Sequence, residues 1–212
     1  MSFKTESFDI EQCFNESLEA YRKNFLAFVL ASLTLFILGP LTIFILFGPL
    51  QAGLMMMILS SMKNEVKPKF DDLFKYFNRF VSFLIGFYIP AILGFIGLFF
   101  LIIPGLLIFT IWIYILILIA DKNLDVVDAM KKSYNLVINN NIWMHIILIL
   151  IVTAILSILS IQQGPLGLIL SILAYPLTIG LIVSAYNQLS RKEHAEVKDN
   201  THINDENKET AT

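Results

Sequence analysis

Residues 80–120 constrain the fold most, because these 41 consecutive residues contain no charged side chain. One crossing of a bilayer takes about 20 apolar residues, so this block is long enough for two crossings. A turn signal, Ile103-Pro104-Gly105, lies past its middle, where a helical hairpin would reverse. Of all residues, 57% are hydrophobic and only 15% are charged, against roughly a quarter charged in soluble domains. The sequence therefore predicts an all-α integral membrane protein.

Charge is confined to four segments of the chain. Every Lys, Arg, Asp and Glu lies in residues 4–23, 63–79, 121–132 or 191–209. If each charge-free block between these segments crosses the membrane twice, all four segments lie on one side. The 15 Lys and Arg residues then mark that side as cytoplasmic, because loops rich in Lys and Arg stay there. We therefore expect about six transmembrane helices in three hairpins, with both termini in the cytoplasm.

The blocks divide the chain into a single polytopic membrane domain, residues 1–190, and a tail, residues 191–212. The tail is polar and has no aromatic residue, so we expect it to be disordered, because it has too little apolar surface to offset its chain entropy. The expected hairpins are residues 25–62, 80–120 and 142–190. The segments that precede them are expected to form amphipathic helices on the cytoplasmic membrane surface, at residues 1–24, 63–79 and 121–141.

Turn residues indicate where the hairpins reverse. The first block contains two candidates, Gly39-Pro40 and Gly48-Pro49. Both interpretations stay open, because the dipeptide that is not the turn can form a kink or the start of a helix. In the third block the polar interruption is Gln162-Gln163-Gly164-Pro165, which predicts crossings near residues 142–161 and 166–189.

The three segments before the hairpins carry apolar residues at helical spacing. Such spacing places the side chains on one face of a helix, as in helices that lie on a membrane surface. Asp125 is the expected N-cap of the third helix. The alternative, in which each segment simply extends a crossing into the cytoplasm, stays open. The predicted apolar faces are Leu18, Tyr21 and Phe25; Leu73, Tyr76 and Phe80; and Val127, Met130, Tyr134 and Val137.

Three groups of motifs follow one another within residues 13–190. They are Gly48-Pro49-Leu50-Gln51-Ala52-Gly53-Leu54 with Phe70-Asp71-Asp72-Leu73-Phe74, then Ile102-Ile103-Pro104-Gly105, then Ala120-Asp121 with Asp128-Ala129-Met130-Lys131-Lys132-Ser133-Tyr134 and Asn141-Ile142-Trp143. In these motifs the chain resembles the DUF975 and YciC-like families of uncharacterised prokaryotic integral membrane proteins. It also resembles the membrane domain fused to some glycerophosphoryl diester phosphodiesterases.

The resemblance implies a six-helix membrane domain and transfers no catalytic residue, because no phosphodiesterase catalytic domain is present. The residues that carry the motifs are interpreted as structural. They are Gly48, Pro49, Gly53, Asp72, Phe74, Pro104, Gly105, Asp121, Ala129, Ser133 and Trp143.

Few residues within the expected crossings can do chemistry. His145 is the only ionisable side chain there besides the tyrosines, and ionisable groups within membranes are functional candidates. A hydrogen-bonded anchoring role beside Trp143, near the interface, is the alternative. Gln51 and Asn187 are further polar candidates, which either line a pathway or hold helices together. We expect no catalytic, cofactor-binding or metal site, because a metal needs clustered His, Cys, Asp or Glu.

Two classes of function remain open. The first is a non-enzymatic module of the prokaryotic cytoplasmic membrane that binds lipid, or a partner protein or peptide. The alternative is a transporter or permease-like protein for an uncharged or amphipathic solute. Nucleic acid is not an expected partner, because a net charge of −2 offers no basic footprint.

Overall fold

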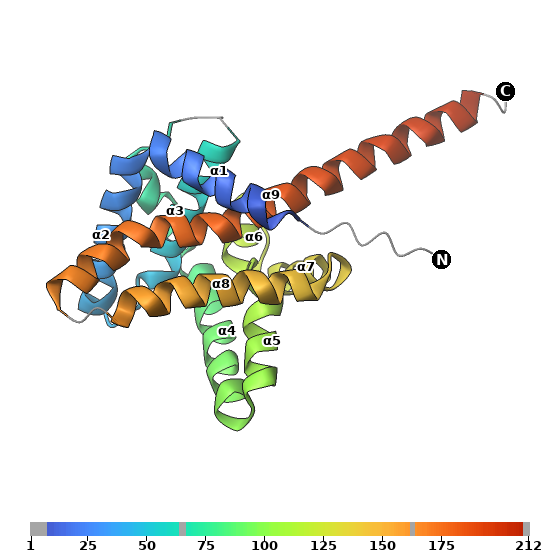
Figure 1. The fold of residues 1–212 in the computed structure, drawn as a ribbon. Helices are drawn as coiled ribbons and strands as arrows, with labels where there is room; N and C mark the ends of the chain where they lie inside the picture. The colour runs from blue at the N-terminus through green and yellow to red at the C-terminus, as the bar shows by residue number, and fades with distance from the viewer. Residues whose placement is uncertain (1–7, 64–66, 162–163, 210–212) are drawn as a thin grey trace.

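The computed structural model describes residues 8–63, 67–161 and 164–209, and every regular element in them is a helix (Figure 1). This confirms the predicted all-α fold class. The described elements are α1 (Ile10–Lys23), α2 (Phe25–Leu41), α3 (Phe47–Met62), the 3-10 helix η1 (Phe70–Arg79), α4 (Phe80–Phe100), α5 (Ile102–Ile111), α6 (Ile115–Asp121), α7 (Val126–Asn139), α8 (Ile142–Ile161) and α9 (Pro165–Glu209).

Consecutive helices pack in pairs. α2 contacts α3, α4 contacts α5, and α8 contacts α9. α1 lies along α9, which also packs against α3. The α4–α5 hairpin projects away from the other helices, and the C-terminal part of α9 extends beyond the bundle in another direction (Figure 1). The buried core is therefore centred on α3, α6 and the middle of α9.

Three helical stretches are long and apolar enough to cross a membrane: Phe70–Phe100, Ile102–Asp121 and Pro165–Ala195. Two bent pairs, α1 with α2 at 95° and α7 with α8 at 105°, raise the number to five if each pair is one span. α3 is apolar but only 16 residues long. These helices fit a membrane-embedded protein. The six crossings expected from the charge pattern exceed the three to five candidates that the described residues contain.

Neither Gly-Pro dipeptide forms the first turn by itself. Gly39-Pro40 lies at the end of α2, and Gly48-Pro49 lies in the first turn of α3, where a proline is tolerated because its amide would have no partner in the helix. The reversal occupies residues 42–46, in which Ile43 and Phe44 have positive φ angles of 52° and 61°. The turn was missed because large apolar residues rarely adopt this conformation.

The second reversal comes earlier than Pro104. α4 ends at Phe100 and Leu101 is extended, so Pro104 lies in the first turn of α5. Gly105 serves the packing of the hairpin instead, because a Cβ there would lie 2.4 Å from the backbone nitrogen of Leu98. The chain breaks again at residues 112–114, so the expected second crossing of this block consists of the two helices α5 and α6.

The buried face of α1 differs from the prediction. α1 buries Cys13, Ser17 and Ala20, whereas Leu18 and Phe25 are exposed. A Cβ added to Gly180 of α9 would lie 3.0 Å from the Ser17 side chain. Small residues let the two helices approach closely, so packing against α9 selects this face.

α7 follows the same rule. Asp125 is its N-cap, as predicted, and accepts a hydrogen bond from the Asp128 amide. The helix buries Ala129, Ser133 and Val137. Val127 and Tyr134, which were predicted to share the apolar face with Met130 and Val137, are exposed. Again the small side chains face the protein, and the larger ones point outward.

The segment before α4 is a 3-10 helix that packs on α3. Leu73 is fully buried and Tyr76 is half-buried, in agreement with the predicted face. A Cβ on Gly53 would lie 2.2 Å from the Leu73 carbonyl oxygen, so this contact requires glycine. Asp72 accepts a hydrogen bond of 2.8 Å from the Lys69 amide and caps the helix.

The described part of the tail is helical, and the expected disorder of residues 191–212 stays a prediction. α9 continues as a helix from the bundle to Glu209. Gly180 is the last glycine or proline of the chain, so no residue after it breaks the helix.

Candidate functional site

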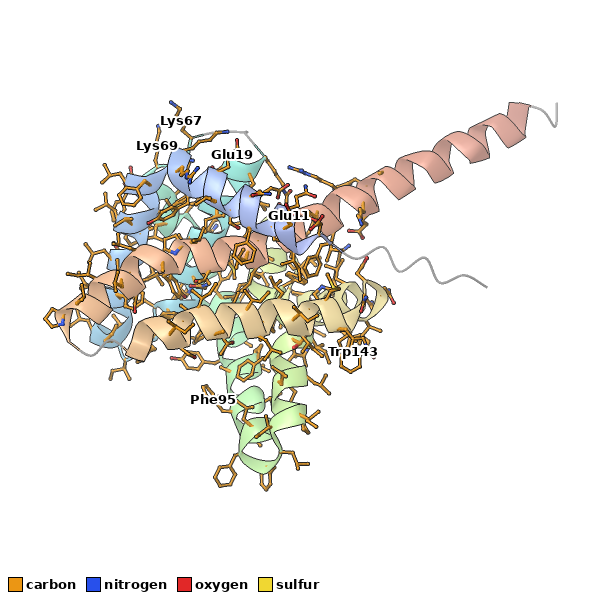
Figure 2. All side chains as sticks on the ribbon, viewed as in Figure 1. Glu11, Glu19, Lys67, Lys69, Phe95 and Trp143 are labelled. Atoms are coloured by element: carbon orange, nitrogen blue, oxygen red, sulfur yellow. The ribbon has the colours of Figure 1, made fainter. Side chains whose placement is uncertain are left out.

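An apolar groove of about 640 Å³ lies where the α4–α5 hairpin meets α3, α8 and α9. Its volume falls within the roughly 300–1,000 Å³ of typical ligand pockets. Phe95, which Figure 2 shows on the projecting hairpin, belongs to its wall. Its lining side chains include Phe47, Gln51, Met55, Phe87, Ala91, Phe95, Leu106, Phe109, Trp112, Ile113, Leu150, Thr153, Tyr175 and Ile182.

The groove has one hydrogen-bonded polar pair in its wall. The Tyr175 hydroxyl donates to the Gln51 side-chain oxygen at 2.6 Å. The Tyr175 ring is held edge-on against Phe36, with 5.5 Å between ring centroids. Gln51, a polar candidate from the sequence, thus lines the groove, and its orientation is fixed by a residue 124 positions later in the chain.

No lining residue of the groove carries a charge. The Gln51 oxygen is occupied by Tyr175, whereas its amide nitrogen has no hydrogen-bond partner among the described residues. The indole nitrogen of Trp112 likewise has no partner in the described part of the chain. The groove therefore offers hydrogen-bond donors on a mostly apolar wall, which also includes the Thr153 hydroxyl.

His145 lies in a separate, closed environment. Its side chain is fully buried, and its Nδ1 lies 3.1 Å from the Asn141 carbonyl oxygen. The ring packs edge-on against Phe8 and Tyr114, at centroid distances of 4.9 and 5.6 Å. The expected hydrogen bond is present. The expected neighbour Trp143 is 71% exposed at the start of α8 (Figure 2), so His145 is a core residue and not an exposed anchor.

Asn187 is also buried apart from the groove. Neither polar atom of its side chain has a hydrogen-bond partner among the described residues. It lies 12 positions after Tyr175 on α9, which is about 18 Å along a helix. The structure therefore does not bring the three polar candidates from the sequence together, and only Gln51 belongs to a cavity.

An ion cluster joins three helices near the charged end of the bundle. Asp121 at the end of α6 binds Lys63 at 3.2 Å and accepts a hydrogen bond of 2.6 Å from the Tyr186 hydroxyl. Arg79 bonds the carbonyl oxygens of Ile119 and Leu124, at 3.1 and 2.7 Å. These contacts close the bundle where the charged segments meet. An open pocket of about 740 Å³ beside them is lined by charged side chains of α7 and α9, among them Asp128, Lys132 and Glu193.

A hydrogen-bond network fixes α1 on α9. The Asp9 amide donates to the Gln188 side chain at 2.8 Å, and the Gln188 amide donates back to the Asp9 carbonyl at 3.2 Å and to the Cys13 sulfur at 3.4 Å. Ser184 donates to Glu16, which also pairs with Arg191. Burial raises the pKa of the Cys13 thiol to about 12, so this thiol is neutral and unreactive at neutral pH.

The motif residues behind the family resemblance mostly hold helices together. A Cβ on Gly48 would lie 2.5 Å from the Phe83 carbonyl oxygen. Ser133 bonds the backbone at the break between α5 and α6, and Phe74 and Trp143 are exposed. The roles of Gly53, Asp72, Gly105 and Asp121 are the contacts described above.

Among the residues that the structure describes, no group of three His, Cys, Asp or Glu side chains could hold a metal ion. Comparison of the chain with protein-family models, curated proteins and solved structures finds no match.

Sequence analysis missed the partner residues of the groove. The sequence did not single out Trp112, and it did not distinguish Tyr175 from the other tyrosines of the expected crossings. The apolar residues that line the groove could not be recognised from the sequence, because most of the chain consists of similar apolar residues. The unusual position of a Gln within the glycine-rich start of α3 was the available signal.

Proposed function

We propose that this protein is a non-enzymatic, multi-pass module of the prokaryotic cytoplasmic membrane that binds lipid in the groove between the α4–α5 hairpin, α3, α8 and α9. The observation that carries this proposal is an uncharged, largely apolar groove of about 640 Å³. An acyl chain fits such a wall because burial of apolar surface is favourable and non-directional.

The distribution of charge supports the proposed orientation. Glu11, Glu19, Lys67 and Lys69 gather at the end of the molecule away from the α4–α5 hairpin tip (Figure 2). The tip itself exposes large apolar side chains, with Phe99 at 87% and Leu101 at 66%. We place the hairpin within the bilayer and the charged segments at the cytoplasmic surface, in line with the positive-inside rule. We also propose that this chain belongs to the DUF975-like group.

The absence of catalysis is also part of the proposal. General acid–base chemistry needs a titratable group within reach of the reacting atoms. Tyr175 is the one titratable side chain in the lining of the groove, and its hydroxyl is engaged by Gln51. A partner protein or peptide at the cytoplasmic face remains compatible with this role, through exposed residues such as Leu18 and Tyr134.

A transporter for an uncharged or amphipathic solute is the second candidate, because the groove lies between helices and not on a flat surface. The two are separated by measuring flux. Protein in liposomes should bind lipid without accelerating movement of a labelled lipid or solute between the leaflets. Accelerated movement would favour the transporter.

Lipid binding can be tested by a substitution that fills the groove with a larger side chain. Ala91 lines it, so Ala91→Phe should lower the lipid retained by the purified protein, measured by native mass spectrometry from detergent. Ala154 is exposed and lies outside the groove, so Ala154→Phe is the matched control. Equal lipid retention in wild type and Ala91→Phe would refute binding in the groove.

A further inference from the structure

We infer that the groove selects a lipid acyl chain attached through an uncharged ester carbonyl, and that the Gln51 amide donates a hydrogen bond to this carbonyl oxygen. The inference rests on the proposed function, since it specifies the chemical class of lipid for the same groove. The Gln51 carboxamide is held in one orientation by its hydrogen bond to Tyr175.

The orientation of the carboxamide follows from Tyr175. A phenol hydroxyl within an apolar wall requires an acceptor, and the Gln51 oxygen is its acceptor at 2.6 Å. The oxygen is thereby engaged and the amide nitrogen is left to donate. Gln51 as a whole is only 4% exposed, yet its amide nitrogen is not among the fully enclosed unpaired atoms of the described residues, so a ligand can reach it. Within a bilayer no water is present to accept its hydrogen bond. An unfilled donor there is costly, and a ligand that brings an acceptor removes that cost.

The second donor points to the same chemistry. The Trp112 indole can only donate, and it lines the same groove. The groove thus presents donors from α3 and from the start of the α5–α6 break, on a wall whose remaining polar side chains are Thr153 and Tyr175. The ligand that matches this wall is an apolar chain with a carbonyl acceptor.

The lack of charged side chains in the groove excludes an ionised ligand such as a free fatty acid. A free fatty acid would carry its carboxylate into a groove without Lys, Arg or His in its lining. An unpaired charge in such a place is strongly unfavourable. An ester is uncharged, and its charged headgroup can stay at the membrane surface while the chain and the carbonyl enter the groove.

The test compares two lipids that differ only in the carbonyl. Diacyl phosphatidylglycerol and its dialkyl ether analogue have the same chains and headgroup, but the ether lacks the carbonyl oxygen. Wild-type protein in detergent, exposed to an equal mixture, should retain the diacyl lipid about two- to tenfold better, as expected for one hydrogen bond. Native mass spectrometry counts both lipids on the intact protein.

The variants separate the donor from the groove. Gln51→Leu combined with Tyr175→Phe removes the polar pair without leaving an orphan hydroxyl, so total lipid binding should remain and the preference for the ester should fall. Trp112→Phe keeps the ring but removes the indole donor, and should lower the preference in part. If the double variant does not fold, the inference is still tested by Trp112→Phe and by the preference of wild-type protein for the diacyl lipid over the ether lipid.

The outcomes distinguish this inference from the proposed function. Loss of lipid in Ala91→Phe with no ester preference in wild type would overturn the inference and keep the groove as a lipid site. Unchanged lipid in Ala91→Phe would overturn both. Displacement of diacyl lipid by an equimolar isoprenoid quinone, whose ring carbonyls also accept hydrogen bonds, would overturn the ester assignment in favour of a quinone.

Discussion

Ser133 of α7 donates a hydrogen bond of 2.7 Å to the Ile111 carbonyl oxygen, at the point where α5 ends. The same hydroxyl accepts from the Tyr114 amide at 3.3 Å. A break within an apolar helix leaves backbone groups without partners, and in a membrane such groups must be satisfied inside the protein. One small side chain from a charged segment therefore makes the break between α5 and α6 possible.

Replacing this hydroxyl should destabilise the protein. Ser133→Ala leaves the Ile111 carbonyl without its side-chain partner in a buried place, at a cost of about 1–3 kcal/mol. We expect a lower thermal unfolding temperature in detergent, followed by tryptophan fluorescence. Asn135→Ala, at an exposed position of the same helix, is the control and should unfold like wild type. Identical unfolding of both variants would show that the hydroxyl is dispensable.

Gly53 should tolerate no side chain. In Gly53→Ala the new methyl group would meet the Leu73 backbone at 2.2 Å, so α3 and η1 must separate. Backbone cannot move aside as a flexible side chain can, and overpacking of this kind costs about 1–3 kcal/mol or more. Loss of monodisperse protein in size-exclusion chromatography, or a lower unfolding temperature, would show this.

The matched control for this substitution is Gly39→Ala. There the added Cβ meets only side-chain atoms, of Phe47 at 3.3 Å and of Phe44 at 3.8 Å, and a helical Gly→Ala change otherwise favours the helix. If Gly39→Ala proves as damaging as Gly53→Ala, the specific contact with η1 does not explain the result.

The orientation in the membrane can be read by cysteine labelling. In a variant in which Cys13 is replaced by Ala, single cysteines at Lys67 and Lys131 should react with a membrane-impermeant maleimide only in inverted vesicles. Both positions are exposed and belong to charged segments. Phe99→Cys at the hairpin tip should not react from the cytoplasmic face. Labelling of Lys67→Cys in intact cells would contradict the proposed topology.

Because of Cys13, the free energy of unfolding should decrease at alkaline pH. Burial raises its pKa from the ordinary 9.0 to about 12, so between these values the unfolded thiol ionises while the folded thiol keeps its proton. The unfolded state then binds fewer protons, and the free energy of unfolding decreases as pH rises from about 9 toward 12. The Cys13 contribution is fully present below pH 9.

The comparison with Cys13→Ala isolates this contribution from other groups that titrate at high pH. Unfolding temperatures measured from pH 8 to 10.5 should decline more steeply for wild type than for the variant. Parallel declines would mean that the thiol is as accessible to ionisation in the folded protein as in the unfolded chain.

Hydrophobic blocks predicted the class of protein, since a charge-free run such as residues 80–120 has few alternatives. They could not predict where helices break. The turn at Ile43 and Phe44 and the break before Ile115 use apolar residues in conformations without a local signature. These breaks depend on tertiary partners such as Ser133, which lies 22 positions from its acceptor.

The amphipathic helices show a second limit of prediction from the sequence. Periodicity identified α1 and α7, but it assigned the largest apolar residues to the buried face. The structure instead buries Ser17, Ala20 and Ala129 and exposes Leu18 and Val127. In water, size and burial correlate; beside a membrane, large apolar side chains can face lipid and small ones let helices touch. For the same reason the groove, apart from Gln51, was invisible in the sequence.

The uninterrupted length of α9 has a mechanical consequence. Ile182 lies in the wall of the groove, and Glu209 ends the same helix. The 27 residue steps from Ile182 to Glu209 span about 40 Å at the rise of an α-helix. A small rotation of α9 at the groove would therefore displace the far end of the helix by a distance proportional to that length.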